Sequence, residues 1–268
     1  MRRAQPARFK LGIVGGIGPA ATVDFMAKIV RNTSAAKDQD HIRLLVEQNP
    51  QIPDRTAHLL HQADDPTLAL YATCRRLEAG GASAIALPCN TAHAFVERIQ
   101  PYLGVPIINM LQETVDDIVR RYGAGSTVGL LATSGTVASR VYHSVAQPLL
   151  TVLTPEPDFQ QRVMNAIYGP RGVKAGYTDG ACRDDLLAAI DHLAARGAAV
   201  MILGCTELPL IVAQTDRHSA AGKTVAVVDP TNVLARRCIQ IAQAYAVPAP
   251  PGSRRPDPFI RPATLPNP

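Results

Sequence analysis

The chain contains 268 residues, of which 47% are hydrophobic and 18% are charged, and it has no tryptophan. This composition predicts a globular protein with one large core or two smaller ones, and it excludes a disordered chain. The formal net charge of +5 comes from basic residues near the two ends, so no basic face for nucleic acid is expected.

Neither end of the chain resembles a membrane or export segment. No stretch approaches the roughly 18 consecutive apolar residues that span a bilayer, so no membrane is expected as a partner. Residues 1–9 form a basic, flexible leader without the apolar stretch of a secretion signal, which predicts a cytoplasmic protein. Residues 246–268 contain eight prolines and are predicted to form an extended or disordered tail.

The first predicted strand, residues 10–14, leads into the sequence GGIGP and a helix that begins at Pro19, where a missing N–H costs nothing. Gly16 starts a match to Gly-x-Gly-x-x-Ala, which is typical of dinucleotide sites but weak when it stands alone. We therefore expect a tight turn that leaves room for a small anion or a carboxylate.

A second strand at residues 43–47 is followed by the turn-rich sequence QNPQIPDRT. Asp54 and Arg55 lie where this loop meets the next helix. The Arg55 guanidinium could hold a carboxylate through two parallel hydrogen bonds, or the two residues could simply cap the helix. The sequence leaves both interpretations open.

Strand and helix patterns alternate through the rest of the chain, which predicts parallel sheets. The further strands are expected at residues 84–87, 105–108, 126–131, 149–153, 200–203 and 225–228. The further helices are expected at residues 66–79, from 93, 111–122, 138–147, 157–168, 179–195, from 207, and 230–245.

Two stretches occur twice at nearly the same spacing. Residues 77–91 (LEAGGASAIALPCNT) parallel residues 193–206 (LAARGAAVMILGCT) at an offset of 116, and residues 11–19 parallel residues 128–136 at an offset of 117. Two independent matches at one spacing predict two halves of similar topology. Each copy of the first stretch ends a short apolar strand with a cysteine, Cys89 or Cys205.

Cys89 and Cys205 therefore occupy the carboxyl ends of buried strands, where open α/β sheets place their chemistry. A thiol has a reference pKa of about 8.5, so moderate help from the following helix yields thiolate. Two matched thiols in a shared cleft suit the transfer of a proton from one face of a carbon to the other. The five cysteines of the chain contain no Cys-x-x-Cys pair, so neither a disulfide framework nor a metal site is expected.

The motifs GGIGP, NPQIPDRT, LPCNTAHAF, LLATSGT, GVKAG and LGCTELPLI together resemble the aspartate/glutamate racemase superfamily, and most closely its aspartate racemases. The resemblance extends from about residue 10 to residue 245. It implies an α/β fold of two pseudo-symmetric parallel-sheet domains with the active site in the cleft between them. It also implies a small amino-acid substrate, no cofactor and no metal, and a homodimer.

We expect the first lobe to comprise residues 10–108 plus about 222–245, with Cys89, and the second lobe to comprise residues 109–221, with Cys205. By motif match, Cys89 and Cys205 resemble the paired acid/base residues. Arg55 and Lys174 resemble the groups that recognise the distal carboxylate, with Asp54 adjacent. The residues that match the family's sites for the α-carboxylate and amino group are Asn90, Thr91, Thr133, Ser134 and Thr206. Supporting roles are expected for Gly16, His93 and Glu207.

The sequence thus predicts an isomerase that interconverts L- and D-aspartate, or a close acidic amino acid, by proton transfer between two cysteines. One departure from the family pattern is the loop YGPRGVKAG, which is longer and carries an extra Arg171 near Lys174. This bears on side-chain specificity. The alternatives are another reaction of the superfamily, such as racemisation of a different amino acid or isomerisation of an unsaturated diacid, and a non-catalytic metabolite-binding homologue.

Overall fold

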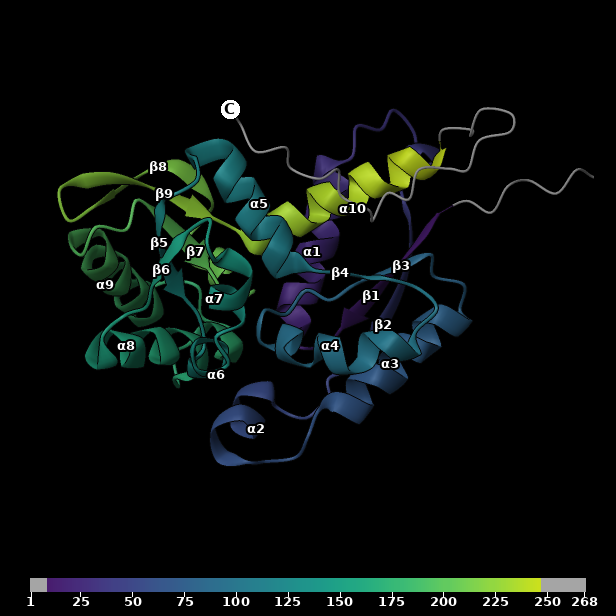
Figure 1. Cartoon of the computed structure of the whole chain (residues 1–268), viewed down its shortest axis with the longest axis horizontal. Coiled ribbons are helices and arrows are strands. Elements are labelled where there is room, and N and C mark those ends of the chain that lie inside the picture. The colour runs from purple at the N-terminus through teal and green to yellow at the C-terminus, as the bar shows by residue number, and fades with distance from the viewer. Residues whose placement is uncertain (1–8, 247–268) are drawn as a thin grey trace, which may run out of the picture.

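The computed structural model describes residues 9–246, which form two lobes with one β-sheet each (Figure 1). Apart from Phe9 and Ala246, the expected leader and tail lie outside the described residues. Phe9, placed in the leader, is buried and packs on the ring of Tyr245 at a centroid distance of 5.0 Å. None of the described helices is long and apolar enough to cross a membrane.

The first lobe is built on a sheet of four parallel strands in the order β2-β1-β3-β4. The strands are β1 (Lys10–Gly15), β2 (Arg43–Gln48), β3 (Ala84–Ala86) and β4 (Ile107–Ile108). Its helices are α1 (Pro19–Asn32), α2 (Arg55–His61), α3 (Thr67–Ala79) and α4 (Val96–Ile99). Successive residues of β1 face opposite sides of the sheet, so Leu11 and Ile13 join one core and Val14 joins the other. Both faces of this sheet are therefore covered.

The second lobe contains a sheet of five strands in the order β6-β5-β7-β9-β8. The strands are β5 (Thr127–Leu131), β6 (Thr151–Leu153), β7 (Val200–Leu203), β8 (Thr215–Ala220) and β9 (Lys223–Val228). The remaining helices are α5 (Met110–Tyr122), α6 (Ser134–Ala138), α7 (Val141–Ala146), α8 (Pro157–Tyr168), α9 (Ala181–Ala195) and α10 (Pro230–Ala246). Buried side chains of β7 alternate between two cores, which again places the sheet between two layers.

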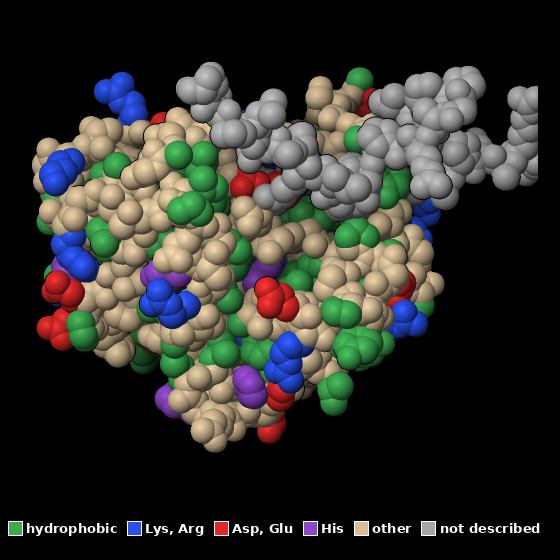
Figure 2. All heavy atoms as spheres, in the orientation of Figure 1, with side chains coloured by type: hydrophobic (Ala, Val, Ile, Leu, Met, Phe, Trp, Pro, Cys, Tyr) green, Lys and Arg blue, Asp and Glu red, His purple; other side chains and the backbone are tan. Residues whose placement is uncertain are grey.

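The four parallel strands of each sheet follow the same order, because β6-β5-β7-β9 repeats β2-β1-β3-β4. The register repeats as well: Leu11 pairs with Ala84 in the first lobe, and Val128 pairs with Val200 in the second. These pairs are related by the offsets of the repeated stretches, so the predicted duplication of topology is confirmed. Basic and acidic side chains are interspersed on the face drawn in Figure 2.

The first lobe was expected to include residues from about 222 to 245, and this prediction is wrong for strand β9. Strand β9 pairs with β7 in the second sheet, and only α10 returns to the first lobe, where it packs on α1. The antiparallel pair of β8 and β9 was not predicted. β8 is a polar edge strand without an alternating apolar pattern, and its hairpin turns at Ala221 and Gly222, which both have positive φ.

Two expected helices are shorter and tighter than predicted. The helix expected from residue 207 is a 3-10 turn, Leu208–Leu210, and the one expected from residue 93 is a 3-10 turn, Thr91–Phe95, followed by α4. The turns begin two residues after Cys89 and three residues after Cys205. Pro209 lies in the first turn of the second-lobe segment, a position in which proline is tolerated.

A buried ion pair connects the end of β9 to the first lobe. Asp229 follows β9 and caps α10 by accepting a hydrogen bond from the Thr231 N–H at 2.9 Å. Its other oxygen pairs with Lys28 of α1 at 2.6 Å, and Lys28 also contacts Asp24 and the Thr231 hydroxyl. Lys28 is only 4% exposed. The connection between the second sheet and the first lobe is therefore stabilised by ion pairs as well as by apolar packing.

Candidate active site

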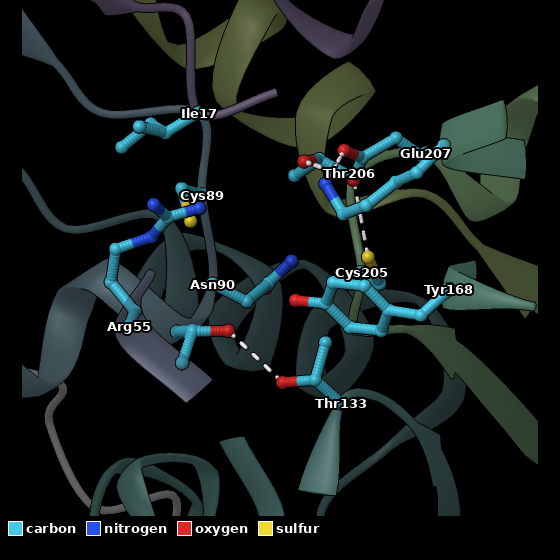
Figure 3. Close-up of a pocket in the computed structure, with 12 residues that line it drawn as sticks. Ile17, Arg55, Cys89, Asn90, Thr133, Tyr168, Cys205, Thr206 and Glu207 are labelled. Carbon is cyan, nitrogen blue, oxygen red and sulfur yellow. Dashed lines mark hydrogen bonds and ion pairs between the residues drawn. The ribbon is translucent and has the colours of Figure 1, made fainter. Parts of the chain in front are cut away.

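Cys89 and Cys205 lie just past the ends of the equivalent strands β3 and β7, one in each lobe. Both are 6% exposed, and both line a single cavity between the lobes. In Figure 3 the Cys89 sulfur lies on the side of Arg55, and the Cys205 sulfur lies on the side of Glu207. The two thiols therefore approach the same space from different lobes.

The cavity has a volume of about 20 Å³, which is room for about one water molecule. It is lined by residues of both lobes: Ile17, Arg55, Cys89, Asn90, Thr91, Thr133, Tyr168, Lys174, Gly204, Cys205, Thr206 and Glu207. An amino acid is much larger than water, so the described conformation is a closed one.

Arg55 is the first residue of α2 and points into the cavity (Figure 3). It is 8% exposed, and its Nη1 donates to the carbonyls of Ile52 and Pro53 at 3.3 and 3.0 Å. Its Nε has no hydrogen-bond partner among the described residues. Burial works against the charge, but the attraction of Cys89 and Asp54 outweighs it and raises the pKa of Arg55 above its ordinary value. Arg55 is therefore a fixed cation beside Cys89.

Asp54 has the capping role that the sequence left open. Its Oδ1 accepts a hydrogen bond from the Ala57 N–H at 2.7 Å, which makes it the N-cap of α2. Its Oδ2 lies 3.5 Å from the Tyr168 hydroxyl of the second lobe. Asp54 does not line the cavity; it orients the helix turn that carries Arg55.

Lys174 lies on a 3-10 turn, Val173–Ala175, in the loop between α8 and α9. Its ammonium forms an ion pair with Oε1 of Glu207, whose side chain is only 4% exposed. Burial works against the charge of Lys174, but the Glu207 carboxylate outweighs it and raises the lysine pKa. Burial would keep Glu207 neutral, but Lys174 lowers the glutamate pKa below its ordinary value. Both groups are therefore charged, and each compensates the other.

Asn90 presents an unpaired donor to the cavity. Its Oδ1 accepts a hydrogen bond from the buried Tyr142 hydroxyl at 2.7 Å, and this contact fixes which way the amide faces. Its Nδ2 is buried without a hydrogen-bond partner in the part of the chain that the structure describes. Figure 3 shows this nitrogen directed toward the space between the two lobes. A buried donor of this kind is costly unless a ligand accepts from it.

Four threonine hydroxyls connect the two lobes beside the cavity. Thr133 of the second lobe lies 3.1 Å from Thr56 and 3.2 Å from Thr91 of the first lobe. Thr136 completes the cluster at 2.7 Å from Thr91. A hydroxyl both donates and accepts, so the cluster can present its free hydrogens or lone pairs to a bound molecule.

His93 is buried behind the Cys89 turn and does not line the cavity. Its Nδ1 lies 2.9 Å from the Cys89 carbonyl oxygen, and its Nε2 accepts a hydrogen bond from the Met110 N–H at 3.1 Å. Because Nε2 accepts, Nδ1 carries the proton and donates to Cys89. Burial lowers the pKa of His93 from 6.5 to about 4. It is a neutral support for the turn that holds Cys89.

The glycine turn after β1 lies against the carboxylate of Glu207, which is part of the chain itself. A Cβ on Gly18 would overlap Oε1 of Glu207 and would lie 3.2 Å from Nζ of Lys174. Gly16 has a φ of +92°, and a Cβ there would lie 2.5 Å from the Asn49 carbonyl carbon. Gly16 therefore permits the turn, while Gly18 leaves room for the Lys174–Glu207 pair.

Of the residues predicted for the site, Cys89, Cys205, Arg55, Lys174, Asn90, Thr91, Thr133, Thr206 and Glu207 line the cavity. Ser134 does not, and its hydroxyl instead accepts a hydrogen bond from Gln160 at 3.2 Å. Ile17, Tyr168 and Gly204 were not predicted. Tyr168 could have been suspected from its place at the end of a helix, directly before the loop that carries Lys174.

No group of three or more His, Cys, Asp or Glu side chains within residues 9–246 is arranged to hold a metal ion. The polar groups of the cavity instead suit a small charged molecule. Two cations, an amide donor and several hydroxyls face one space that both thiols reach. This arrangement can bind a carboxylate and exchange a proton with an adjacent carbon.

Comparison with curated proteins identifies racemases. The chain is 32% identical over 139 residues to the broad specificity amino-acid racemase RacX of Bacillus subtilis, a match that covers 50% of this chain and 59% of that protein. It is 29% identical over 168 residues to a glutamate racemase of Ectopseudomonas mendocina, covering 60% of this chain and 59% of that protein. The matches thus span about three fifths of these relatives.

Among solved structures, the aspartate racemase of Picrophilus torridus matches with a TM-score of 0.74 and 28% identity, covering 88% of this chain and 94% of that one. An aspartate racemase homologue from Pyrococcus horikoshii shares the fold with a TM-score of 0.68 and 22% identity, covering 87% of this chain and 99% of that one. The family model for Asp/Glu/Hydantoin racemase matches residues 14–238. Since that match takes in both sheets and both cysteines, the chain belongs to the Asp/Glu/Hydantoin racemase family.

Proposed function

We propose that the protein interconverts the L and D forms of aspartate, or of a close acidic amino acid, by moving the α-proton between Cys89 and Cys205. The observation that carries this proposal is that both thiols, from equivalent strand ends of two lobes, line one cavity (Figure 3). A two-base racemase needs a base and an acid on opposite faces of the substrate's α-carbon.

In each turnover one cysteine begins as thiolate and the other as thiol. The thiolate removes the α-proton and becomes a thiol, and the other thiol gives its proton to the opposite face and becomes a thiolate. Charge and protons balance, and the enzyme is left in the form that catalyses the reverse reaction. The duplicated topology of the two lobes suits this symmetry of roles.

The electrostatics of the cavity support removal of a proton next to a carboxylate. Negative charge accumulates on the α-carboxylate as the proton leaves, and buried donors and cations stabilise such charge strongly because they need not reorganise. Asn90 supplies an unpaired N–H donor, and Arg55 supplies a buried guanidinium whose Nε has no partner within the described chain. The Picrophilus torridus protein that matches at 28% identity is described as an aspartate racemase.

A second candidate is a racemase of a different or broader range of amino acids. Lys174 is already paired with Glu207, which is the carboxylate that lines the cavity. Arg55 therefore remains available to bind a carboxylate of the substrate. A site with one available cation can bind the α-carboxylate without requiring a second acidic group. The Bacillus subtilis relative is described as having broad specificity.

Either substrate requires the closed cavity to open. The turn that carries Lys174 lies between Gly172 and Gly176, and Gly176 has a φ of +95°. Movement of this turn would break the Lys174–Glu207 pair and enlarge the cavity on the side of Cys205. Substrate binding is therefore expected to involve the loop between α8 and α9.

The test is a panel of L-amino acids incubated with the enzyme in D₂O. Loss of the α-proton signal by NMR reports exchange, and chiral chromatography reports the D product. Fastest exchange with aspartate supports the first candidate, and comparable exchange with neutral amino acids supports the second. No exchange with any amino acid, by a protein whose circular dichroism shows it to be folded, contradicts both.

A further inference from the structure

Glu207 lies between two groups of the site and contacts both. Its Oε1 pairs with Lys174, and its Oε2 accepts a hydrogen bond from the Cys205 thiol at 3.1 Å. The Thr206 hydroxyl also donates to Oε2 at 3.3 Å. Figure 3 shows the thiol directed at this carboxylate. Glu207 is only 3% exposed, so these contacts are shielded from water.

The charge of Glu207 determines the form of Cys205. A carboxylate can only accept hydrogen bonds, so the sulfur 3.1 Å away must carry the proton. A thiolate there would place two negative charges side by side in a buried site. Burial raises the pKa of Cys205 well above its ordinary value, Glu207 raises it further, and Lys174 offsets only part of this effect.

Cys89 has the opposite surroundings. Arg55, the charged residue of the same lobe that lines the cavity with Cys89, can only donate hydrogen bonds, and among the described residues no carboxylate of that lobe lines the cavity. Besides Glu207, the charged and titratable groups that face Cys205 are Lys174 and Tyr168 from the second lobe and Arg55 and Cys89 from the first. The lobes are thus equivalent in topology but not in charge.

We propose that Glu207 is a positioning residue that keeps Cys205 in the thiol form in the empty enzyme, so that Cys89 is the cysteine that begins as the base. The thiol form of Cys205 is a property of the protein alone, whereas the assignment of Cys89 as the first base rests on the proposed racemase function. The enantiomer whose α-hydrogen faces Cys89 then binds an enzyme already in the right form. The other enantiomer requires that Cys205 first lose its proton to solvent and Cys89 gain one.

The test is the pH dependence of cysteine alkylation by iodoacetamide, followed by tryptic digestion and mass spectrometry. Cleavage after Arg76 and Arg98 isolates Cys89, and cleavage after Arg196 and Arg217 isolates Cys205, so the two sites are read separately. Wild-type protein is compared with Glu207→Gln, which removes the charge but keeps the shape, and with Glu207→Asp, which keeps the charge.

We expect Cys205 of the wild type to become reactive only at higher pH than Cys89. In Glu207→Gln, alkylation of Cys205 at pH 7.5 should be about tenfold faster or more, which corresponds to a shift of one pH unit or more. Cys89 should change much less, and Glu207→Asp should restore the slow reaction of Cys205. A merely structural role would change both cysteines together and would not be rescued by aspartate in this way.

The proposal is overturned if Cys205 of the wild type reacts at lower pH than Cys89, a result that needs no variant to fold. It is also overturned if folded Glu207→Gln leaves the Cys205 profile unchanged or shifts both cysteines equally. No substrate is present in the assay. An inactive protein with the expected alkylation profile would therefore contradict the racemase function alone, and an active racemase without the shift would contradict only the role of Glu207.

Discussion

His93 is predicted to make the stability of the fold depend on pH in a defined window. In the folded protein Nε2 must stay unprotonated, because it accepts the Met110 N–H, and burial holds the pKa of His93 at about 4. In the unfolded chain the pKa returns to about 6.5. Between these values the unfolded state binds a proton that the folded state does not. Stability is therefore full above about pH 6.5 and is lost as the pH falls toward 4.

The size of the effect follows from the shift between 6.5 and about 4, which corresponds to about 3 kcal/mol. The comparison is with His93→Gln, because glutamine can still offer a donor and an acceptor but does not titrate. Urea unfolding at several pH values between 4 and 7 should give a wild-type stability that falls about 3 kcal/mol more than that of the variant. The exposed His61, changed to glutamine, controls for the substitution itself. A constant difference between wild type and His93→Gln across this range would refute the reasoning.

Three substitutions test other parts of the structure. Lys28→Met leaves the buried Asp229 and the partly exposed Asp24 without their cation and should lower the free energy of unfolding by about 3–5 kcal/mol in chemical denaturation. A loss below about 1 kcal/mol would contradict this. Gly135→Ala places a Cβ 2.8 Å from Cα of Thr56, so it should displace α2 with Arg55 and reduce kcat/KM at least about tenfold, and full activity would show that the lobes can adjust. Tyr142→Phe leaves the amide oxygen of Asn90 without its donor, which should lower the free energy of unfolding by about 1–3 kcal/mol in thermal or urea unfolding and raise KM. An unchanged KM would show that the amide keeps its orientation without this hydrogen bond.

The parts of the fold that sequence patterns predicted best are those with strong local signals. Helices that open with proline begin where expected, at Pro19, Pro157 and Pro230, because proline fits the first helical turn and fixes the start. The buried strand β7 was predicted with its observed limits, since a glycine turn followed by four apolar residues leaves few alternatives.

The parts that could not be predicted depend on contacts between distant residues. β8 forms because β9 offers it an edge, and its polar sequence carries no strand pattern of its own. Because that hairpin extends the second sheet, the boundary between the lobes was placed too early.

The same distinction applies to the candidate site. Cys89 and Cys205, at the ends of equivalent strands, line one cavity as predicted. The Lys174–Glu207 pair joins residues 33 positions apart, so no local sequence pattern could predict it. Three statements stay predictions: the roles assigned to these residues, the homodimer implied by the family resemblance, and the cytoplasmic location expected from the basic leader.

The central claim, that two cysteines share one proton transfer, is tested most directly by replacing each in turn. L- and D-aspartate are incubated separately in D₂O with Cys89→Ala, Cys205→Ala and the control Cys74→Ala, whose thiol is buried in the core of the first lobe. The account predicts that Cys74→Ala forms deuterated aspartate of the opposite configuration from either enantiomer. It predicts that neither site variant does so in either direction. Racemisation by Cys89→Ala or Cys205→Ala at a rate near that of the control would contradict it.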